Sequence, residues 1–400
     1  MLKDKVQSLA AKYFRKAVAI RRHIHAHPEL SFQEKKTSQY ISSVFKESGI
    51  PHKKGIAGTG IVALVKGKKI SPEPPVIALR ADMDALPIPE QNNVPYISKN
   101  KGVMHACGHD VHAASLLVVG IILNDIRDRF AGAVKLIFQP GEEKLPGGAS
   151  LMIKGGVLTN PAPRVIVAQH VFPFLETGKA GFRAGKYMAS CDEIYITVKG
   201  RGGHAALPKH TVNPILIASE IICKLNYDFM VPSTATIPEI PTVLSFGKII
   251  AEGATNVIPS SVNLEGTLRT MDEAWREEAH LRIKNIAGEI AAKHSGSCDI
   301  NILKGYPFLI NDEKLTARLK QYAVEYLGRE NVVDLEPMMT SEDFSFYSQE
   351  IPACFYRLGV RNESKGIISP VHSPTFDIDE DALKTAIGLM AWMALRELET

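Results

Sequence analysis

The stretch Val76-Ile-Ala-Leu-Arg-Ala-Asp-Met-Asp-Ala-Leu-Pro87 joins an apolar run to two carboxylates. Residues 76–79 have the composition of a buried strand, and Asp82 and Asp84 follow directly after it. Three further apolar runs have the same character; they cover residues 61–65, 133–138 and 165–168. A segment of helical length, 111–129, separates two of them. Short apolar strands that alternate with helices predict an α/β fold with a mostly parallel, buried sheet.

The pattern of the sequence changes near residue 186 and changes back near residue 304. Alternating strands are predicted at 193–199, 242–250, 261–270 and 298–303, with helices at 213–228 and 272–294. Further helices are predicted outside this segment, at 4–22, 33–48, 312–327 and 380–398. A chain of 400 residues exceeds what one hydrophobic core usually organises. We therefore expect one α/β domain, residues 1–185 and 304–400, interrupted by a smaller α+β domain at 186–303.

Composition and charge exclude several classes of protein. Lys and Arg number 47 and Asp and Glu 43, without long blocks of one sign, which argues against a nucleic-acid partner. The longest apolar run, 116–123, is far shorter than the ~20 residues of a membrane span, and no secretory signal is visible. Five widely spaced cysteines do not form a disulfide framework, so we expect a cytoplasmic protein without a membrane partner. Glycine patterns at 58–63 and 200–205 do not open a helix, which argues against a nicotinamide enzyme.

Acidic, thiol and imidazole side chains follow the apolar runs at several places. Besides 82–84, the motifs are His105-Ala-Cys107-Gly-His109-Asp-Val-His112, Gln139-Pro-Gly-Glu142-Glu143 and Gln169-His170. Because ligands of open α/β sheets bind outside the carboxyl ends of the strands, we expect these groups to converge. Cysteine, histidine and glutamate all bind borderline divalent cations. Of two adjacent glutamates, one can bind metal while the other takes a proton from water.

The remaining histidines are of two kinds. His204, in a glycine-rich loop, and His372, near the end of the chain, are candidate site residues. The group His23, His25 and His27 precedes Pro28 and is interpreted as a helix end, although His23 and His27 have the spacing of a metal pair. Four more histidines are expected on the surface; they are His52, His210, His280 and His294.

Taken together, these segments resemble the metal-dependent aminoacylase family. The family includes N-acyl-amino-acid amidohydrolases, hippurate hydrolases and indole-acetyl-amino-acid hydrolases, and it belongs with the carboxypeptidase-like dinuclear metallohydrolases. The resemblance rests on the combination of residues 80–87, 105–112, 141–143, 202–208, 256–259, 266–269, 341–344 and 372–374. It implies a zinc-peptidase-like catalytic domain and an inserted dimerisation or lid domain.

The resemblance also implies a role for individual residues. Two divalent cations would be held by five side chains, namely Cys107, His109, Glu143, His170 and His372. Glu142 would be the general base, and Asp84 would orient a ligand. His204 would reach the substrate carbonyl, often from the partner subunit, while Asn256 and Arg269 would bind the substrate carboxylate. The ligand types suit manganese or zinc, with cobalt and nickel as alternatives, and the resemblance implies a homodimer or higher homo-oligomer.

The expected reaction is hydrolysis of the amide bond of N-acyl-L-amino acids, giving a carboxylic acid and an amino acid. Two cations lower the pKa of a bridging water, and Glu142 would take its proton and pass it to the leaving amine. One alternative is a cysteine amidase with Cys107 as nucleophile and His109 or His170 as base. The same residues are also compatible with a dipeptidase or carboxypeptidase of this fold, and with a binding protein that has no catalytic activity.

Overall fold

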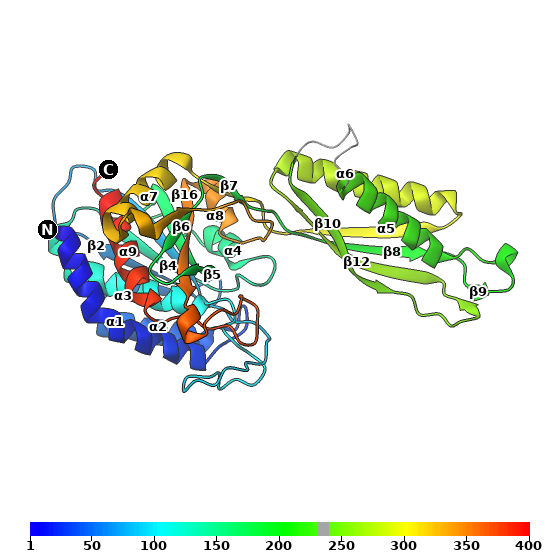
Figure 1. Cartoon of the computed structure of the whole chain (residues 1–400). Helices are drawn as coiled ribbons and strands as arrows, with labels where there is room; N and C mark the ends of the chain where they lie inside the picture. The colour runs from blue at the N-terminus through cyan, green and yellow to red at the C-terminus, as the bar shows by residue number, and fades with distance from the viewer. Residues whose placement is uncertain (231–239) are drawn as a thin grey trace. The chain divides into compact units, whose positions relative to one another are not determined.

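The computed structural model describes residues 1–230 and 240–400, and these form two compact units (Figure 1). Unit 1 consists of residues 1–185, 310–336 and 343–400, and unit 2 of residues 186–309 and 337–342. The second unit thus takes in a short segment, 337–342, that no change of sequence pattern indicates. The roles expected for the two segments, metal binding and dimerisation or substrate closure, stay predictions.

A mixed sheet of eight strands forms the centre of unit 1, in the order β1-β2-β4-β3-β5-β16-β6-β15. Its strands are β1 (His52–Ile56), β2 (Gly60–Lys66), β3 (Val76–Asp82), β4 (Ala133–Gln139), β5 (Val165–Glu176), β6 (Ala180–Phe182), β15 (Val332–Asp334) and β16 (Ala353–Arg361). The central neighbours β4, β3, β5 and β16 pair in parallel, as do β6 and β15. The predicted α/β fold with a mostly parallel sheet is confirmed.

Helices cover this sheet, and one of them is buried on all sides. The helices of unit 1 are α1 (Leu2–Ala26), α2 (Lys35–Glu47), α3 (His109–Asp125), α4 (Gly148–Lys154), α7 (Glu313–Leu327), α8 (Ser345–Glu350) and α9 (Ala382–Glu397). Every residue of α3 from His109 to Leu123 is buried, and α1, α9 and the sheet contact it. A helix that is apolar all round lies within a core, and α3 therefore carries its first residues into the interior of unit 1.

Strand β16 lies in the middle of the sheet, although no strand is predicted there from the sequence. It pairs with β5 from Ala353 opposite Ile166 to Gly359 opposite Phe172. Arg357 interrupts its apolar pattern, which hides the strand from sequence reasoning. In the structure the guanidinium lies 5.6 Å from the ring centre of Phe172, where an aromatic face partly compensates its burial.

Unit 2 is built on an antiparallel four-stranded sheet in the order β10-β12-β8-β13. The strands are β8 (Asp192–Lys199), β10 (Thr242–Ile250), β12 (Ser261–Thr270) and β13 (Ser297–Lys304), and helices α5 (Pro214–Met230) and α6 (Glu273–Lys293) pack against them. Burial alternates along β8, as the sequence pattern predicts for a sheet with one covered face. Short strands complete the described chain: β7 (Gly185–Met188), β9 (Gly203–His204), β11 (Val257–Ile258) and β14 (Leu309–Asn311). Within residues 1–230 and 240–400, no helix has the length and apolarity that a membrane crossing requires.

Candidate active site

Two neighbouring strands of unit 1 end with acidic side chains at the same edge of the sheet. Strands β3 and β4 are paired in parallel as far as Asp82 opposite Gln139, the last residue of each strand. The chain after β3 carries Asp84, and the chain after β4 carries Glu142 and Glu143. The two acidic motifs therefore lie side by side at the carboxyl ends of their strands, where ligands of α/β sheets bind.

His170 lies inside a strand and not at the end of one, which corrects the prediction for 165–168. β5 continues to Glu176, whereas β3 pairs with it only as far as Ala168. β5 thus extends beyond its neighbour and brings His170 beside the start of α3. Gly108, which precedes α3, has φ 78°, and a Cβ there would lie 2.5 Å from a methyl carbon of Val171. Glycine is required at this close approach.

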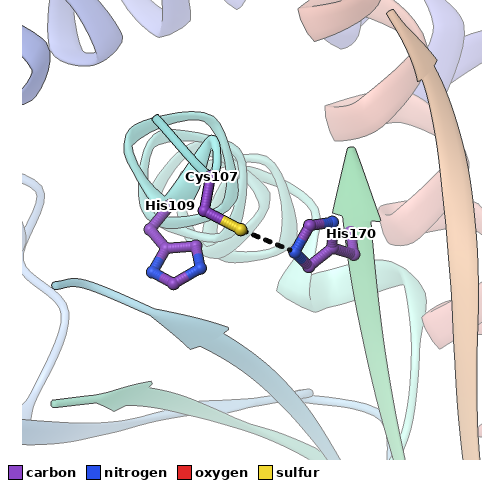
Figure 2. A group of neighbouring side chains, drawn as sticks. All are labelled: Cys107, His109 and His170. Atoms are coloured by element: carbon purple, nitrogen blue, oxygen red, sulfur yellow. Dashed lines mark hydrogen bonds between the residues drawn. The ribbon is translucent and has the colours of Figure 1, made fainter. Parts of the chain in front are cut away.

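Three of the five predicted ligands, Cys107, His109 and His170, lie close together (Figure 2). Its Sγ lies 3.4 Å from Nε2 of His170, and the ligand atoms of Cys107, His109 and His170 all lie within 4.8 Å of one another. A second group that meets the same criterion consists of Cys107, Glu143 and His372. Cys107 therefore belongs to both groups, which is the arrangement expected of a thiolate between two cations.

His372 is held by its backbone, although half of its side chain is exposed. Its N–H donates to the carbonyl oxygen of Ala106 over 2.8 Å, and its φ of 61° lies in the left-handed region that non-glycine residues seldom adopt. Nε2 of the ring lies 3.2 Å from Oε1 of Glu143. The loop thus presents this ring to the buried cluster from the solvent side.

Asp84 is buried and orients His109. One carboxylate oxygen lies 3.1 Å from Nδ1 of His109, and the other accepts from the Ser31 hydroxyl and the Glu143 N–H. Among the described residues, the buried Nε2 of His109 has no hydrogen-bond partner. Asp84 therefore fixes the tautomer that leaves this nitrogen available to a cation.

The electrostatics of the cluster suit cations. Burial, Glu143 and Glu142 raise the pKa of the Cys107 thiol well above its usual value. Burial alone would lower the pKa of His109, but Asp82, Asp84 and Glu143 outweigh it and raise that pKa to about 10. Buried carboxylates and a thiol at close range thus favour added positive charge. Thiolate, imidazole and carboxylate ligands together fit divalent transition-metal ions.

Glu142, the predicted base, lies beside the predicted ligands. It is 6% exposed, and one of its carboxylate oxygens lies within 4.8 Å of a ring nitrogen of His109 and of a carboxylate oxygen of Glu143. The N–H of Asp343 donates to Oε1 of Glu142 over 3.3 Å. The structure therefore brings the predicted base and the five predicted ligands into one cluster of unit 1.

The substrate-binding residues predicted in unit 2 do not all lie together. His204 pairs with Val257 across the short strands β9 and β11, and the carbonyl of Asn256 accepts from the N–H of Ala205, so His204 and Asn256 are neighbours. Arg269 lies on β12, near the end of that strand that is farther from β9. Its Nη1 is 3.2 Å from the Ser341 hydroxyl.

The register of β12 gives the distance between these two places. Ser261 lies opposite Lys199, close to β9, and Arg269 follows eight residues later on the strand. At about 3.3 Å per residue, Arg269 is roughly 26 Å from the Ser261 end. His204 and Arg269 of one chain therefore cannot contact the same small molecule.

Two histidines that the sequence places on helices turn out to bond buried acids. α1 ends at Ala26, beyond the predicted 4–22 but before Pro28, and His25 is fully buried and lies 2.8 Å from Asp110. The surface position predicted for His280 is wrong, because its Nε2 lies 2.6 Å from the buried Asp192. The many charged residues of α6 suggest an exposed helix, but its side that faces β8 packs against Asp192.

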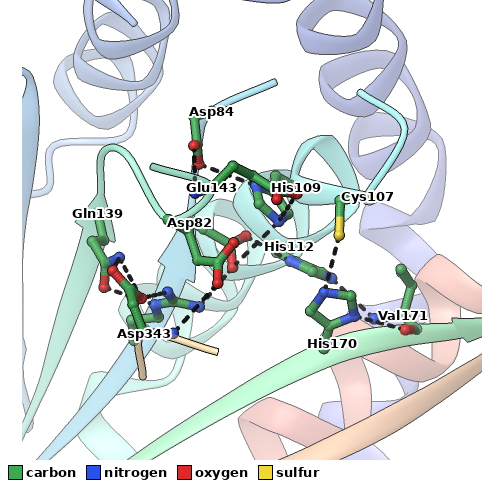
Figure 3. A network of polar contacts seen from close by, with 12 residues as sticks. Asp82, Asp84, Cys107, His109, His112, Gln139, Glu143, His170, Val171 and Asp343 are labelled. Atoms are coloured by element: carbon green, nitrogen blue, oxygen red, sulfur yellow. Dashed lines mark hydrogen bonds and ion pairs between the residues drawn. The ribbon is translucent and has the colours of Figure 1, made fainter. Parts of the chain in front are cut away.

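Buried polar side chains beyond the predicted set adjoin the cluster (Figure 3). Arg80 donates to Asp82 and Asp343 over 2.6 Å each, and Nδ1 of His112 lies 2.6 Å from Asp82. Sequence reasoning assigned these residues no role. The only available signal was position: Arg80 and Asp82 belong to the last three residues of β3, and His112 follows His109 by about one helical turn.

Comparisons with known proteins identify the family of this chain. The sequence profile of peptidase family M20/M25/M40 matches residues 78–396. The chain is 36% identical over 383 residues to N-acetyl-L-cysteine deacetylase of Bacillus subtilis, covering 96% of this chain and 88% of that protein. It is 37% identical over 386 residues to IAA-amino acid hydrolase ILR1-like 2 of Arabidopsis thaliana, covering 96% and 85%.

A solved structure has the same fold. The crystal structure of the Bacillus subtilis YXEP protein, described as a dinuclear metal binding peptidase from the M20 family, superposes with a TM-score of 0.83 at 34% identity. The match covers 98% of this chain and 99% of that one. The chain therefore belongs to peptidase family M20/M25/M40 and is a metal-dependent amidohydrolase or peptidase.

Proposed function

We propose that the protein hydrolyses the amide bond of N-acyl-L-amino acids, releasing a carboxylic acid and a free amino acid. The observation that carries the proposal is the buried Cys107, which is shared by two groups of ligand atoms beside Glu142. The names of two relatives, an N-acetyl-L-cysteine deacetylase and an IAA-amino acid hydrolase, point to N-acylated amino acids as the substrate class.

Two divalent cations would be held by the five predicted ligands. Cys107 would contact both, His109 and His170 would lie on one side, and Glu143 and His372 on the other. When bound, the cations supply Lewis acidity and lower the pKa of water. We propose manganese or zinc, with cobalt or nickel as alternatives, because all of them accept sulfur, nitrogen and oxygen ligands.

Glu142 would act as general base and then as general acid. Its carboxylate would accept a proton from the attacking water and later donate it to the leaving nitrogen, which an amide requires because an amide anion leaves poorly. The N–H of Asp343 holds Oε1 of Glu142 in place over 3.3 Å. Asp84 would keep His109 in the required tautomer throughout.

The substrate would be bound by residues of two chains. A small N-acyl amino acid cannot reach from His204 to Arg269 within one chain, because most of the length of β12 separates them. If both contact the same substrate, the two places must belong to different subunits, and by the family resemblance His204 and Asn256 would come from the partner subunit, where His204 would contact the carbonyl. We therefore propose a homodimer in which unit 2 supplies these contacts and Arg269 binds the substrate carboxylate.

Mixing two inactive variants tests the shared site. His204→Ala and Glu142→Gln homodimers should each be inactive, and a mixture should recover part of the activity, because one of the two sites in a mixed dimer is intact. Homodimers mixed without subunit exchange serve as the control. No recovery in exchanged dimers would mean that each site is complete within one chain.

A peptidase is the second candidate, since the YXEP protein is described as a dinuclear metal binding peptidase. Hydrolysis of N-acetyl, N-benzoyl and N-indoleacetyl amino acids should be compared with that of dipeptides. The metal-free protein reloaded with each of the four metals is used throughout. Preference for dipeptides over every N-acyl amino acid would replace the proposed substrate class.

The surroundings of Cys107 do not favour its use as the nucleophile of a cysteine amidase. A nucleophilic cysteine needs a lowered pKa, whereas burial and the neighbouring Glu143 and Glu142 raise the pKa of this thiol. Activity that survives complete metal removal but is lost on thiol alkylation would favour that alternative. All five cysteines are unpaired, and we propose a reducing compartment, the cytoplasm, as the location.

A further inference from the structure

His112 connects α3 to β5 through a backbone group next to His170. The N–H of Val171 donates to Nε2 of His112 over 3.0 Å, and Nδ1 of the same ring lies 2.6 Å from Asp82 (Figure 3). A backbone N–H can only donate, so Nε2 carries the lone pair. The proton of the neutral ring is therefore on Nδ1 and is donated to Asp82.

Among the described residues, no strand pairs with the backbone of Val171 on the side of β3. β3 pairs with β5 only as far as Ala168, so the polar groups of residue 171 that point toward β3 need other partners. His112 satisfies the N–H, and the carbonyl lies 2.7 Å from Nδ1 of His170. Val171 is thus held between two histidine rings.

This arrangement orients His170 as well. Because its Nδ1–H donates to the Val171 carbonyl, Nε2 is the unprotonated nitrogen, and it faces Sγ of Cys107 at 3.4 Å. Displacing Val171 would therefore move the acceptor that sets both the tautomer and the direction of the His170 ring.

Asp82 is itself fixed by two partners. Its second oxygen accepts from Nη1 of Arg80 over 2.6 Å, and both side chains are fully buried. Arg80 also donates to Asp343 over 2.6 Å, which connects Asp82 to the residue whose N–H holds Glu142. One continuous set of hydrogen bonds therefore runs from the Val171 backbone to the proposed base.

We propose that His112 and Asp82 are positioning residues that hold His170 in its metal-binding orientation through Val171. The inference rests on the proposed metal role of His170. Neither residue needs to contact a cation or substrate for this role. Partners of metal-bound histidines of this kind affect metal affinity by about 10- to 100-fold.

Metal affinity of His112 variants tests the proposal. His112→Phe keeps the ring shape but loses both hydrogen bonds, and it should bind its more weakly held Zn²⁺ about 10- to 100-fold less tightly in competition with a chromophoric chelator. His112→Gln keeps one donor and one acceptor on one amide and should recover part of the affinity. Asp82→Asn should also weaken binding, since His112 and Arg80 donate to different oxygens of Asp82 and the NH2 group that replaces one of them cannot accept.

The matched control is His280→Phe in unit 2, which removes a similar bond to a buried aspartate far along the chain. It should lower the melting temperature of the metal-free protein while leaving Zn²⁺ affinity unchanged. If His112→Phe behaves in the same way, His112 supports only the fold, and the proposal is overturned.

A spectroscopic measurement is independent of whether the variants fold. In wild-type protein with ¹⁵N-labelled histidine, His112 should show a protonated Nδ1 and an unprotonated Nε2, and the opposite tautomer would contradict the proposal. Failure of the proposed function gives a different result. If the proposed metal role of His170 is wrong, wild-type protein does not bind two Zn²⁺ ions per chain, or His170→Ala still binds both ions.

Discussion

Two buried clusters of the same residue types lie in the two units and differ in what surrounds them. Each consists of an aspartate bonded to an arginine and a histidine; the Asp82 cluster contains Arg80 and His112, and the Asp192 cluster contains Arg276 and His280. In the Asp82 cluster, the far side of the histidine ring bonds the backbone beside His170. In the Asp192 cluster, the aspartate accepts from the N–H of Gly305 and so ties α6 and β8 to the end of β13.

This difference shows that residue types alone do not separate a functional network from a structural one. Both clusters pair buried charges, which folding requires of any such group. Only the Asp82 cluster adjoins groups with the donor atoms of a metal site. The role of the Asp82 cluster depends on the neighbouring His170, which comes from a different part of the sequence.

The largest expected effect comes from replacing the arginine of each cluster. Arg80→Met and Arg276→Met each leave a buried aspartate without its guanidinium, and breaking a buried ion pair costs about 3–5 kcal/mol. Urea unfolding followed by circular dichroism measures this loss. Only Arg80→Met should also lower kcat of the molecules that stay folded, because Arg80 bonds Asp343 beside Glu142. Equal kcat losses in both variants would remove the functional distinction between the clusters.

Asp84→Asn should have the next largest effect, on metal binding and not on the fold. The amide is a weaker acceptor for Nδ1–H of His109, and metal affinity should fall by about 10- to 100-fold. Titration of the metal-free protein with Zn²⁺ against a chelator measures it. Asp192→Asn is the control and should leave the affinity unchanged. A loss of affinity in the control would mean that unit 2 also supports the metal site.

Acid should weaken the Asp192 cluster over a defined pH range. Burial alone would raise the pKa of Asp192, but Arg276 and His280 lower it to about 2, below the ordinary value of 3.8. The carboxylate therefore stabilises the folded protein above pH 4, and this contribution of about 2 kcal/mol is lost as the pH falls from 4 to 2. Urea unfolding of wild type and Asp192→Asn at pH 6 and pH 3 measures it. A variant with the same pH dependence as wild type would show that Asp192 does not contribute.

The smallest effect is expected for an exposed pair that resembles the clusters only in charge. Lys224 and Asp228 lie four residues apart on α5 at 2.7 Å, and the Lys224 side chain is half exposed. Because water and salt screen such pairs, Lys224→Ala should change the free energy of unfolding by less than about 0.5 kcal/mol. Urea unfolding measures it, and a loss comparable to that of Arg276→Met would contradict the distinction between buried and exposed charges.

Much of the fold follows from local pattern. Apolar runs indicate β2, β3 and β4, and alternation indicates β10 and β12 with the bounds that the structure has. These elements were predictable because burial on one or both faces leaves a period in the sequence. Strand β16 was not, since Arg357 breaks its pattern, and the rings of Phe172 and Phe355 that lie beside this charge come from contacts that the pattern does not record.

The candidate site divides in the same way. Sequence motifs identified the thiol, imidazole and carboxylate groups, because each follows an apolar run and each is a chemical type that binds metal. The motifs did not show that Cys107 belongs to two ligand groups, nor that His170 lies within a strand. Both facts depend on how far β5 extends past β3, which is a property of the assembled sheet.

The sequence by itself therefore determined the chemical inventory of this protein, the order of its elements and the family to which it belongs. The tertiary structure alone decided which of two similar aspartates adjoins the site, and that His204 lies beyond the Ser261 end of β12 while Arg269 lies near its other end. The physical reason is that periodicity records whether a side chain is buried, while the identity of its neighbours depends on contacts between residues far apart in the chain.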